Sequence, residues 1–276
     1  MGESGTSLHA PAKLNLFLHV RGRRADGYHE LQTLFRLLEF GDTVHLLPAS
    51  RPGVVLDRPT PGVPPESDLA LAAARLLASR AGREDLPGVR IRIDKRIPAG
   101  AGLGGGSSNA AAVLKGLNTY WGLGWPVGKL AALGREIGAD VPVFVKGQDA
   151  WAEGTGERLE PLDLGRAWYV LVCPAIHEST SLAFSDPDLR RNAPRLEKPE
   201  DWKAGGLETA NDFEPGFLRR NPEAVPIRDQ MGRHGPVRLT GTGSAMFIEF
   251  PEKTRAMEVG RTLACRYNTL LTRSVA

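Results

Sequence analysis

Cysteine is scarce in this chain. Cys173 and Cys265 are the only two among 276 residues, and they lie far apart and outside any spacing that is typical of metal ligands. Two isolated thiols exclude a disulfide framework and indicate a protein of a reducing compartment. We therefore expect a cytoplasmic location.

Long apolar runs are missing as well. No stretch reaches the roughly 18 consecutive apolar residues that a membrane-spanning helix needs. The opening segment MGESGTSLHAPAK has neither the basic patch nor the apolar core of a secretory signal. Gly2 and Thr6 match the short pattern for myristoylation, although an unstructured tail accounts for the same residues. We expect no membrane partner.

A strong imbalance of charge is also lacking. The chain has 35 Lys and Arg against 32 Asp and Glu, a net charge of +3. A small basic excess suits anionic small molecules as well as nucleic acid, so it does not separate the two. The densest basic cluster is RGRRADGYHE at 21–30, which is either a solvated loop or a contact surface for an anion.

Strand and helix patterns are mixed in both halves of the chain. Period-two alternation predicts strands at residues 10–20, 89–94, 168–174 and 238–250, the last interrupted by a glycine turn. Apolar residues at helical spacing predict helices at 67–82, about 107–120, 127–138 and 252–264. Residues 186–206 are polar and rich in proline, as in a surface excursion. Without strict βαβ alternation, the order favours an α+β fold with two lobes.

The first predicted strand has two different faces. Its alternation places four apolar side chains toward a core: Leu14, Leu16, Leu18 and Val20. The other face carries Lys13, Asn15, Phe17 and His19. Lys13 and Asn15 are two residues apart and so share one side of the strand.

The stretch IPAGAGLGGGSSNAA, at 97–111, joins a strand to a helix and is rich in glycine. Glycine permits positive φ and close approach of other groups, and a helix N-terminus presents free N–H groups that favour an anion such as phosphate. Ser107 and Ser108 could cap the helix or contact phosphate and its metal. Gly106 stands where the P-loop pattern needs lysine, and a match to G-x-G-x-x-G lacks a Rossmann context. The alternative is a flexible connection without a ligand.

Four stretches together carry a resemblance to a known family: PAKLNLFL, RADGYHELQTLF, GLGGGSSNAA and GADVPVFV. The glycine stretch resembles the nucleotide loop of the galactokinase, homoserine kinase, mevalonate kinase and phosphomevalonate kinase superfamily. APAKLNLFLHV resembles the first motif of that superfamily and LTGTGSAMF its third. The four together, within residues 10 to 250, resemble the narrower family of 4-diphosphocytidyl-2-C-methyl-D-erythritol kinases.

The resemblance implies a two-lobed α+β small-molecule kinase. Its N-terminal ATP-binding lobe would occupy 1–155 and its C-terminal ferredoxin-like lobe 156–276, with the active site in the cleft between them. The implied reaction moves the γ-phosphoryl group of ATP to the 2-hydroxyl of 4-diphosphocytidyl-2-C-methyl-D-erythritol. The products are the 2-phosphate and ADP, in the non-mevalonate pathway to isoprenoid precursors.

Two residues match the family's catalytic positions, Lys13 in PAKLN and Asp140 in GADVPVF. Phosphoryl transfer needs mainly positioning and charge stabilisation, and a carboxylate can orient the hydroxyl and accept its proton late. A nearby lysine would lower the pKa of Asp140 and attract the phosphoryl oxygens. Without the resemblance, a loop aspartate that caps a turn and a strand lysine that snorkels to the surface would be the default interpretation.

The resemblance also implies a pocket for the cytidine end of the substrate. Tyr28 and His29 follow an Asp-Gly turn in the segment that grips the cytosine, and Phe184 matches the other stacking aromatic. Core packing is the alternative for the two aromatic rings. The remaining substrate-binding candidates are Asn15, Thr180, Gly241, Thr242 and Gly243.

The nucleotide would lie on the glycine loop. The candidates for binding it are Lys95, Pro98, Gly100, Gly102, Leu103, Gly104, Gly105, Gly106, Ser107 and Ser108. Mg²⁺ is implied by ATP, and Ser108 is its candidate protein ligand. The family often has asparagine where this chain has Asp68, which loses the amide donor at the adenine.

Two other functions stay open. A kinase of the same superfamily acting on homoserine or mevalonate would share the loop, but GYHELQTLF would then have no base to grip. A non-enzymatic nucleotide- or RNA-binding domain would use the basic residues 21–24, but would leave Lys13 and Asp140 without a role. We expect a small-molecule substrate, no nucleic acid, and a monomer or weak homodimer.

Overall fold

The computed structural model describes residues 5–196 and 210–275. The strands are β1 (Thr6–Arg23), β2 (His29–Pro48), β3 (Val54–Leu56), β4 (Val89–Asp94), β5 (Ala150–Gly154), β6 (Arg158–Pro161), β7 (Trp168–Val172), β8 (Arg238–Leu239), β9 (Met246–Phe250) and β10 (Thr269–Arg273). The helices are α1 (Leu69–Ala81), α2 (Gly105–Tyr120), α3 (Val127–Ile137), α4 (Val141–Lys146), α5 (Thr180–Ser185), α6 (Glu214–Arg220), α7 (Val225–Gly232) and α8 (Lys253–Ala264).

The chain divides into two compact units, each built from several segments. Unit 1 contains described residues 5–12, 40–99 and 104–147, and unit 2 contains 13–39, 100–103, 148–196 and 210–275. The long strands β1 and β2 therefore contribute to both units. The predicted division at residue 155 stays a prediction.

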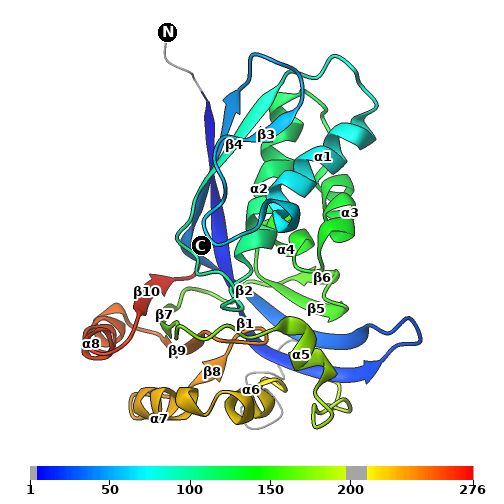
Figure 1. The fold of residues 1–276 in the computed structure, drawn as a ribbon. Coiled ribbons are helices and arrows are strands. Elements are labelled where there is room, and N and C mark those ends of the chain that lie inside the picture. The colour runs from blue at the N-terminus through cyan, green and yellow to red at the C-terminus, as the bar shows by residue number, and fades with distance from the viewer. Residues whose placement is uncertain (1–4, 197–209, 276) are drawn as a thin grey trace. The chain divides into compact units, whose positions relative to one another are not determined.

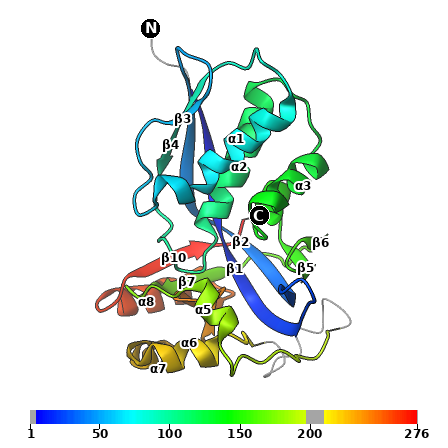
Figure 2. The same cartoon turned by 45° about the vertical axis from the view of Figure 1, so that its right-hand side comes forward.

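Unit 1 packs helices beside a sheet. β4 pairs antiparallel with β2, from Thr43 opposite Asp94 onward, and β3 pairs parallel with β4. The helices α1 to α4 contact one another and lie together in Figures 1 and 2. Small residues let α2 pack closely: a Cβ on Gly116 would lie 2.5 Å from a methyl group of Leu46. Ala110, Ala111 and Ala112 are buried as well, so the small residues of this helix form part of its packing surface.

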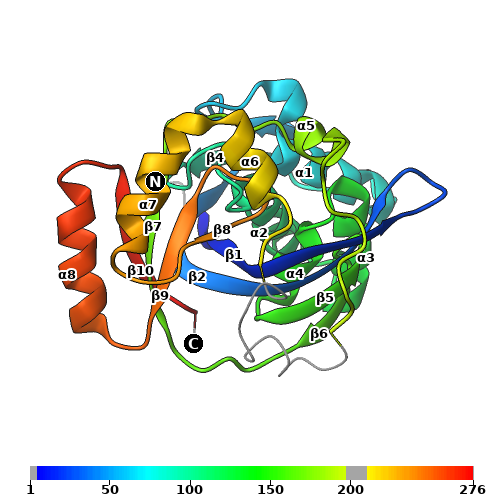
Figure 3. The same cartoon turned by 90° about the horizontal axis from the view of Figure 1, so that it is seen from below.

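Unit 2 contains a four-stranded antiparallel sheet in the order β10-β7-β9-β8. Helix α8 packs on β7, β9 and β10 and lies beside these strands in Figure 3. Val170, Ile248, Phe217 and Leu263 belong to one buried apolar cluster of this unit. The first part of β2 pairs with β5, and β5 pairs with β6.

Several local predictions are confirmed. Val89, Ile91 and Ile93 of β4 are buried, as the alternation predicted. The carboxylate of Asp68 caps α1 by accepting from the backbone N–H groups of Ala70 and Leu71, at 2.9 and 3.2 Å. The helix ends at Gly82, which has a φ of 62°. The helix lies where the apolar spacing predicted it, and its observed cap and terminal glycine are local features of the same stretch.

Other expectations need correction. Both faces of β1 are buried from Ala12 to Val20, so its polar face is a second interior surface. Helix α2 begins at Gly105, two residues earlier than predicted, and Gly104 is its N-cap, so neither Ser107 nor Ser108 caps it. Gly2 and residues 197–206 of the predicted polar excursion lie outside the described residues. Over the described part of the chain, no helix combines the length and apolar character needed to cross a membrane.

Candidate active site

Lys13 and Asn15 lie side by side on β1, as their spacing predicted. The Nζ atom of Lys13 donates to Oδ1 of Asn15 at 2.5 Å, and both side chains are buried. The amide nitrogen of Asn15 donates to the hydroxyl of Thr33 at 2.9 Å. With donors on its oxygen and an acceptor at its nitrogen, the Asn15 amide has one orientation.

The glycine turn at 240–244 closes on the same two residues. The backbone N–H of Gly241 donates to Oδ1 of Asn15 at 2.9 Å, and the Asn15 N–H donates to the hydroxyl of Thr240 at 3.0 Å. Gly241 and Gly243 have positive φ values of 58° and 107°, which explains glycine at both positions. The hydroxyl of Thr242 lies 3.4 Å from that of Thr180 on α5. Unit 2 thus brings together the predicted residues Lys13, Asn15, Thr180 and the turn.

The first half of the phosphate-loop candidate contacts this cluster within unit 2. The backbone N–H of Lys13 donates to the carbonyl of Leu103 at 3.0 Å. Gly102 has a φ of 74°, and a Cβ there would lie 2.2 Å from the carbonyl oxygen of Thr240. Gly100 and Gly104 also have positive φ, at 70° and 72°. The glycine pattern therefore reflects both backbone conformation and close approach, and Pro98 precedes this bend.

The second half of the loop belongs to unit 1 and begins α2. Gly105 and Gly106 form its first turn, which Ser107 and Ser108 continue. A Cβ on Gly138 would lie 3.8 Å from Oγ of Ser107, so the segment that leads to Asp140 is next to this helix terminus. Asp140 is the half-buried residue directly before α4. Lys13 and Asp140 belong to different units, so their convergence stays a prediction.

Lys95 is held by a residue that the sequence reasoning missed. Asp42 is fully buried, and its Oδ2 accepts from Nζ of Lys95 at 2.5 Å and from the amide of Asn109 at 3.0 Å. Its Oδ1 accepts from the backbone N–H groups of Arg96 and Ile97, at 2.7 and 2.8 Å. Nζ of Lys95 would lie 3.0 Å from a Cβ on Gly105. Asp42 thus holds the cation at the start of the phosphate loop, and no local pattern singles it out.

An aromatic cluster forms where the cytidine pocket is predicted. The ring centroids of His29 and Phe184 are 5.0 Å apart, and Phe184 packs edge-on against Phe213 at 4.8 Å. Tyr28 follows the turn at Gly27, and 66% of its surface is exposed. Tyr28 directly precedes the buried His29, so its exposed ring is available for stacking next to this pair.

Arg191 decides the protonation of His29. Its Nε donates to Nε2 of His29 at 3.2 Å, and because arginine is only a donor, Nε2 must be an acceptor. His29 is therefore neutral, with its proton on Nδ1. Burial lowers the pKa of His29, and the charges of Arg191 and Arg23 lower it further. The Arg191 guanidinium also donates to the carbonyls of Phe184 and Asp186, at 3.0 and 2.9 Å.

The candidate metal position offers one hard ligand. Oγ of Ser108 is buried and has no hydrogen-bond partner among the described residues. Within 5–196 and 210–275, no group of three or more His, Cys, Asp or Glu is arranged to hold a metal ion. A hydroxyl oxygen suits Mg²⁺, which usually keeps several water and phosphate ligands. The residues therefore fit a metal held mainly by the nucleotide.

Comparisons with known proteins define the class first. Models of the GHMP kinases match residues 68–148 for the N-terminal domain and 190–269 for the C-terminal domain. The fold is also that of the Methanococcus jannaschii mevalonate kinase structure, with a TM-score of 0.73 at 14% identity over 99% of both chains. The fold and the domain models are those of an α+β GHMP kinase.

Closer relatives narrow the family. A 4-diphosphocytidyl-2-C-methyl-D-erythritol kinase of Xanthomonas euvesicatoria pv. vesicatoria (strain 85-10) is 51% identical over 257 residues, covering 92% of this chain and 85% of the relative. A crystal structure of 4-(cytidine 5'-diphospho)-2C-methyl-D-erythritol kinase matches with a TM-score of 0.84 at 34% identity, over 98% of this chain and 100% of that one. This chain belongs to the 4-diphosphocytidyl-2-C-methyl-D-erythritol kinase family.

Proposed function

We propose that this chain phosphorylates the 2-hydroxyl of 4-diphosphocytidyl-2-C-methyl-D-erythritol with ATP, as a step toward isoprenoid precursors. Membership of the family supports the reaction, and the His29–Phe184 ring pair is the observation in this chain that carries the substrate assignment. A ring pair 5.0 Å apart beside an exposed tyrosine suits a flat base, which homoserine and mevalonate lack. The superfamily alternative therefore leaves this cluster without a purpose.

His29 supplies the recognition of the base edge in this proposal. With Nε2 occupied by Arg191, its Nδ1–H is the donor that remains. That donor is complementary to N3 or O2 of cytosine, which accept hydrogen bonds, and not to the 4-amino group. Tyr28 and Phe184 would contribute stacking, worth about 1–3 kcal/mol per base.

Lys13 and Asp140 carry the chemistry. Asp140 would accept a hydrogen bond from the substrate hydroxyl and take its proton as the bond from that oxygen to the γ-phosphorus forms. The bond from the γ-phosphorus to the β–γ bridging oxygen breaks, and ADP leaves with the electron pair. Asn15 holds Nζ of Lys13 in place at 2.5 Å, which keeps an ammonium directed at the transferring oxygens.

The glycine loop and Lys95 would bind the triphosphate. The N–H groups at the start of α2 face a negative ligand, and Lys95 adds a positive charge beside Gly105. Mg²⁺, when bound with ATP, neutralises phosphate charge, and Ser108 is the residue that would contact it. A cytoplasmic location, a monomer or weak homodimer, and no nucleic-acid partner stay predictions.

A coupled assay of ADP release tests the function. We expect turnover with ATP and 4-diphosphocytidyl-2-C-methyl-D-erythritol, and a far lower rate with homoserine or mevalonate at equal concentration. His29→Ala should raise KM for the cytidine substrate and leave KM for ATP nearly unchanged. Comparable rates on all three alcohols would reject the substrate assignment.

A further inference from the structure

Helix α5 has a buried carboxylate at each end. Glu178 lies two residues before its first residue, and Asp186 directly follows its last. Their exposed fractions are only 7% and 8%. The helix between them carries Thr180 and Phe184, two candidate residues for binding the substrate. Whatever holds these carboxylates therefore also holds that helix.

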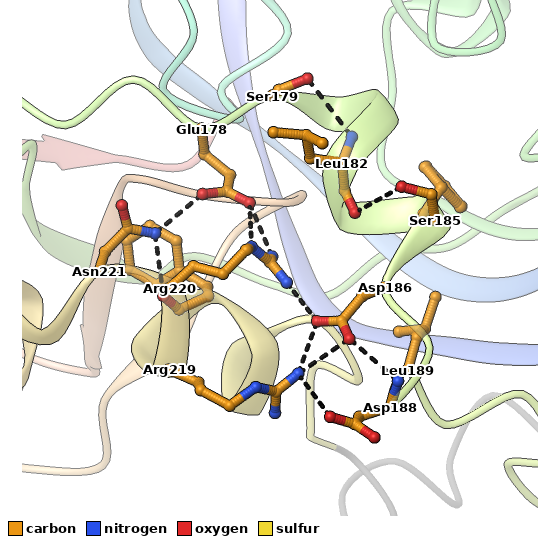
Figure 4. Close-up of polar contacts among 12 residues, drawn as sticks. Glu178, Ser179, Leu182, Ser185, Asp186, Asp188, Leu189, Arg219, Arg220 and Asn221 are labelled. Atoms are coloured by element: carbon orange, nitrogen blue, oxygen red, sulfur yellow. Dashed lines mark hydrogen bonds and ion pairs between the residues drawn. The ribbon is translucent and has the colours of Figure 1, made fainter.

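One side chain binds both carboxylates. Nε and one terminal nitrogen of Arg220 donate to Oε1 of Glu178 at 3.0 and 2.7 Å. The other terminal nitrogen of Arg220 donates to Oδ2 of Asp186. Figure 4 shows the Arg220 guanidinium between the two carboxylates, on a side chain that extends from α6. Asn221, the next residue, donates to the second oxygen of Glu178 at 2.8 Å.

The neighbouring Arg219 differs in one respect. It donates to both oxygens of Asp186, at 2.9 and 2.8 Å, and is 3.3 Å from Asp188. All of its partners thus lie beyond the C-terminal end of α5. Burial alone would raise the pKa of the Asp186 carboxyl, but the N–H of Asp188 and the charges of Arg219 and Arg220 bring it below its usual value.

Arginine suits this bridge and lysine does not. A guanidinium is a planar fork with five donors, so it can serve two carboxylates on different sides at once. An ammonium is a compact charge on a flexible stem, so a lysine could form strong hydrogen bonds to only one of the two carboxylates at a time. Loss of the shared donor would leave a buried carboxylate poorly compensated, which is strongly unfavourable. The helix would then shift until water reached the carboxylate that had lost its donor.

We propose that Arg220 is a positioning residue that sets the place of Thr180 and Phe184 by bonding both ends of α5, and so tunes the affinity for the cytidine end of the substrate. This inference rests on the proposed function. Phe184 packs against His29, so a shift of α5 would also disturb the ring that reads the base edge. Such displacement acts most directly on Thr180 and Phe184, the residues that α5 carries.

Steady-state kinetics of Arg220→Lys, Arg220→Gln and Arg219→Gln test the proposal. For Arg220→Lys we expect KM for 4-diphosphocytidyl-2-C-methyl-D-erythritol to rise about tenfold, with kcat and KM for ATP within about twofold of wild type. Arg220→Gln should have a larger effect of the same kind. Arg219→Gln, which loses contacts at one end only, should change KM for the cytidine substrate by less than about threefold.

Three outcomes would overturn it. They are an unchanged KM for the cytidine substrate in Arg220→Lys, equal rises in KM for both substrates, or the same rise in Arg219→Gln. Melting temperatures distinguish a folding defect from a displacement of α5 in a folded variant. If Arg220→Gln does not fold, the kinetics of Arg220→Lys test the proposal alone. Failure of the wild-type protein to phosphorylate the cytidine substrate would reject the proposed function instead, because the inference is read from variant-to-wild-type ratios.

Discussion

Asp42→Asn is the substitution whose effect follows most directly from the structure. The fully buried carboxylate accepts two backbone N–H groups on Oδ1, and the Lys95 ammonium and the Asn109 amide on Oδ2. An asparagine oxygen can still accept from the backbone. Its new NH₂ group would then face two donors, so two hydrogen bonds are lost and an ion pair is broken.

The loss of stability in Asp42→Asn depends on how well water can solvate the Lys95 ammonium once its partner is gone. Removing one partner of a buried ion pair costs about 3–5 kcal/mol of stability. The Lys95 side chain is 11% exposed, so it can turn partly toward water, and we expect the lower end, about 3 kcal/mol. That is a large share of the 5–15 kcal/mol that stabilises a typical domain. Because Lys95 adjoins Gly105, KM for ATP should rise, while KM for the cytidine substrate stays near wild type.

Urea unfolding, followed by tryptophan fluorescence, measures the loss of unfolding free energy. An unchanged dependence of that free energy on urea concentration would show that the unfolded state is not affected. Asp85→Asn is a matched control, because Asp85 pairs with Arg83 on the exposed surface, and it should leave the midpoint nearly unchanged. Adding Lys95→Met to Asp42→Asn should restore part of the stability, since the amide then no longer faces an ammonium. A loss below about 1 kcal/mol for Asp42→Asn would refute this reasoning.

Three further predictions concern the site directly. Asp140→Asn should lower kcat by at least about a hundredfold with little change in affinity for the cytidine substrate, and near-normal turnover would reject the role of Asp140. The pKa of His29 is lowered from its ordinary 6.5, so the ring is neutral at pH 7 and KM for the cytidine substrate should rise only below pH 6.5. The unfolded chain binds this proton more readily than the folded chain does. The contribution of His29 to stability is therefore lost as the pH decreases below 6.5. A KM for the cytidine substrate that is lower in acid than at pH 7 would contradict the assigned tautomer. Gly102→Ala should weaken ATP binding and stability, because its Cβ would lie 2.2 Å from the Thr240 carbonyl, whereas Gly122→Ala, at a φ of 60° with nothing within 4 Å, carries the backbone strain alone; equal effects of the two would show that crowding at Gly102 is unimportant.

Local signals in the sequence were sufficient for much of the fold. Alternation located β4, and apolar residues at helical spacing located α1. The spacing of Lys13 and Asn15 placed them on one side of β1, where they are indeed bonded. Each of these features depends on residues that are close together in the sequence, so a short stretch of sequence is enough to predict it.

The same signals failed where distant segments interact. Alternation separated the face of β1 with Lys13 and Asn15 from its apolar face, but it did not show that this second face is buried as well. Residues more than 200 positions away cover it at the glycine turn. Ser107 and Ser108 were candidates for the helix cap or for contact with phosphate, and the cap position is occupied by Gly104 in a left-handed conformation. Neither Thr33 nor Arg191 was singled out, because each owes its importance to a partner far along the chain.

By itself, the sequence determined the family, the order of elements and the residue types that the chemistry needs, since motif spacing and periodicity are written along the chain. Only the tertiary structure decided which buried charges are paired. Asp42 meets Lys95 across 53 positions, and Arg220 meets Glu178 across 42. Burial makes an unpaired charge costly, but periodicity reports only that a position is buried. The identity of the partner is settled when the chain packs.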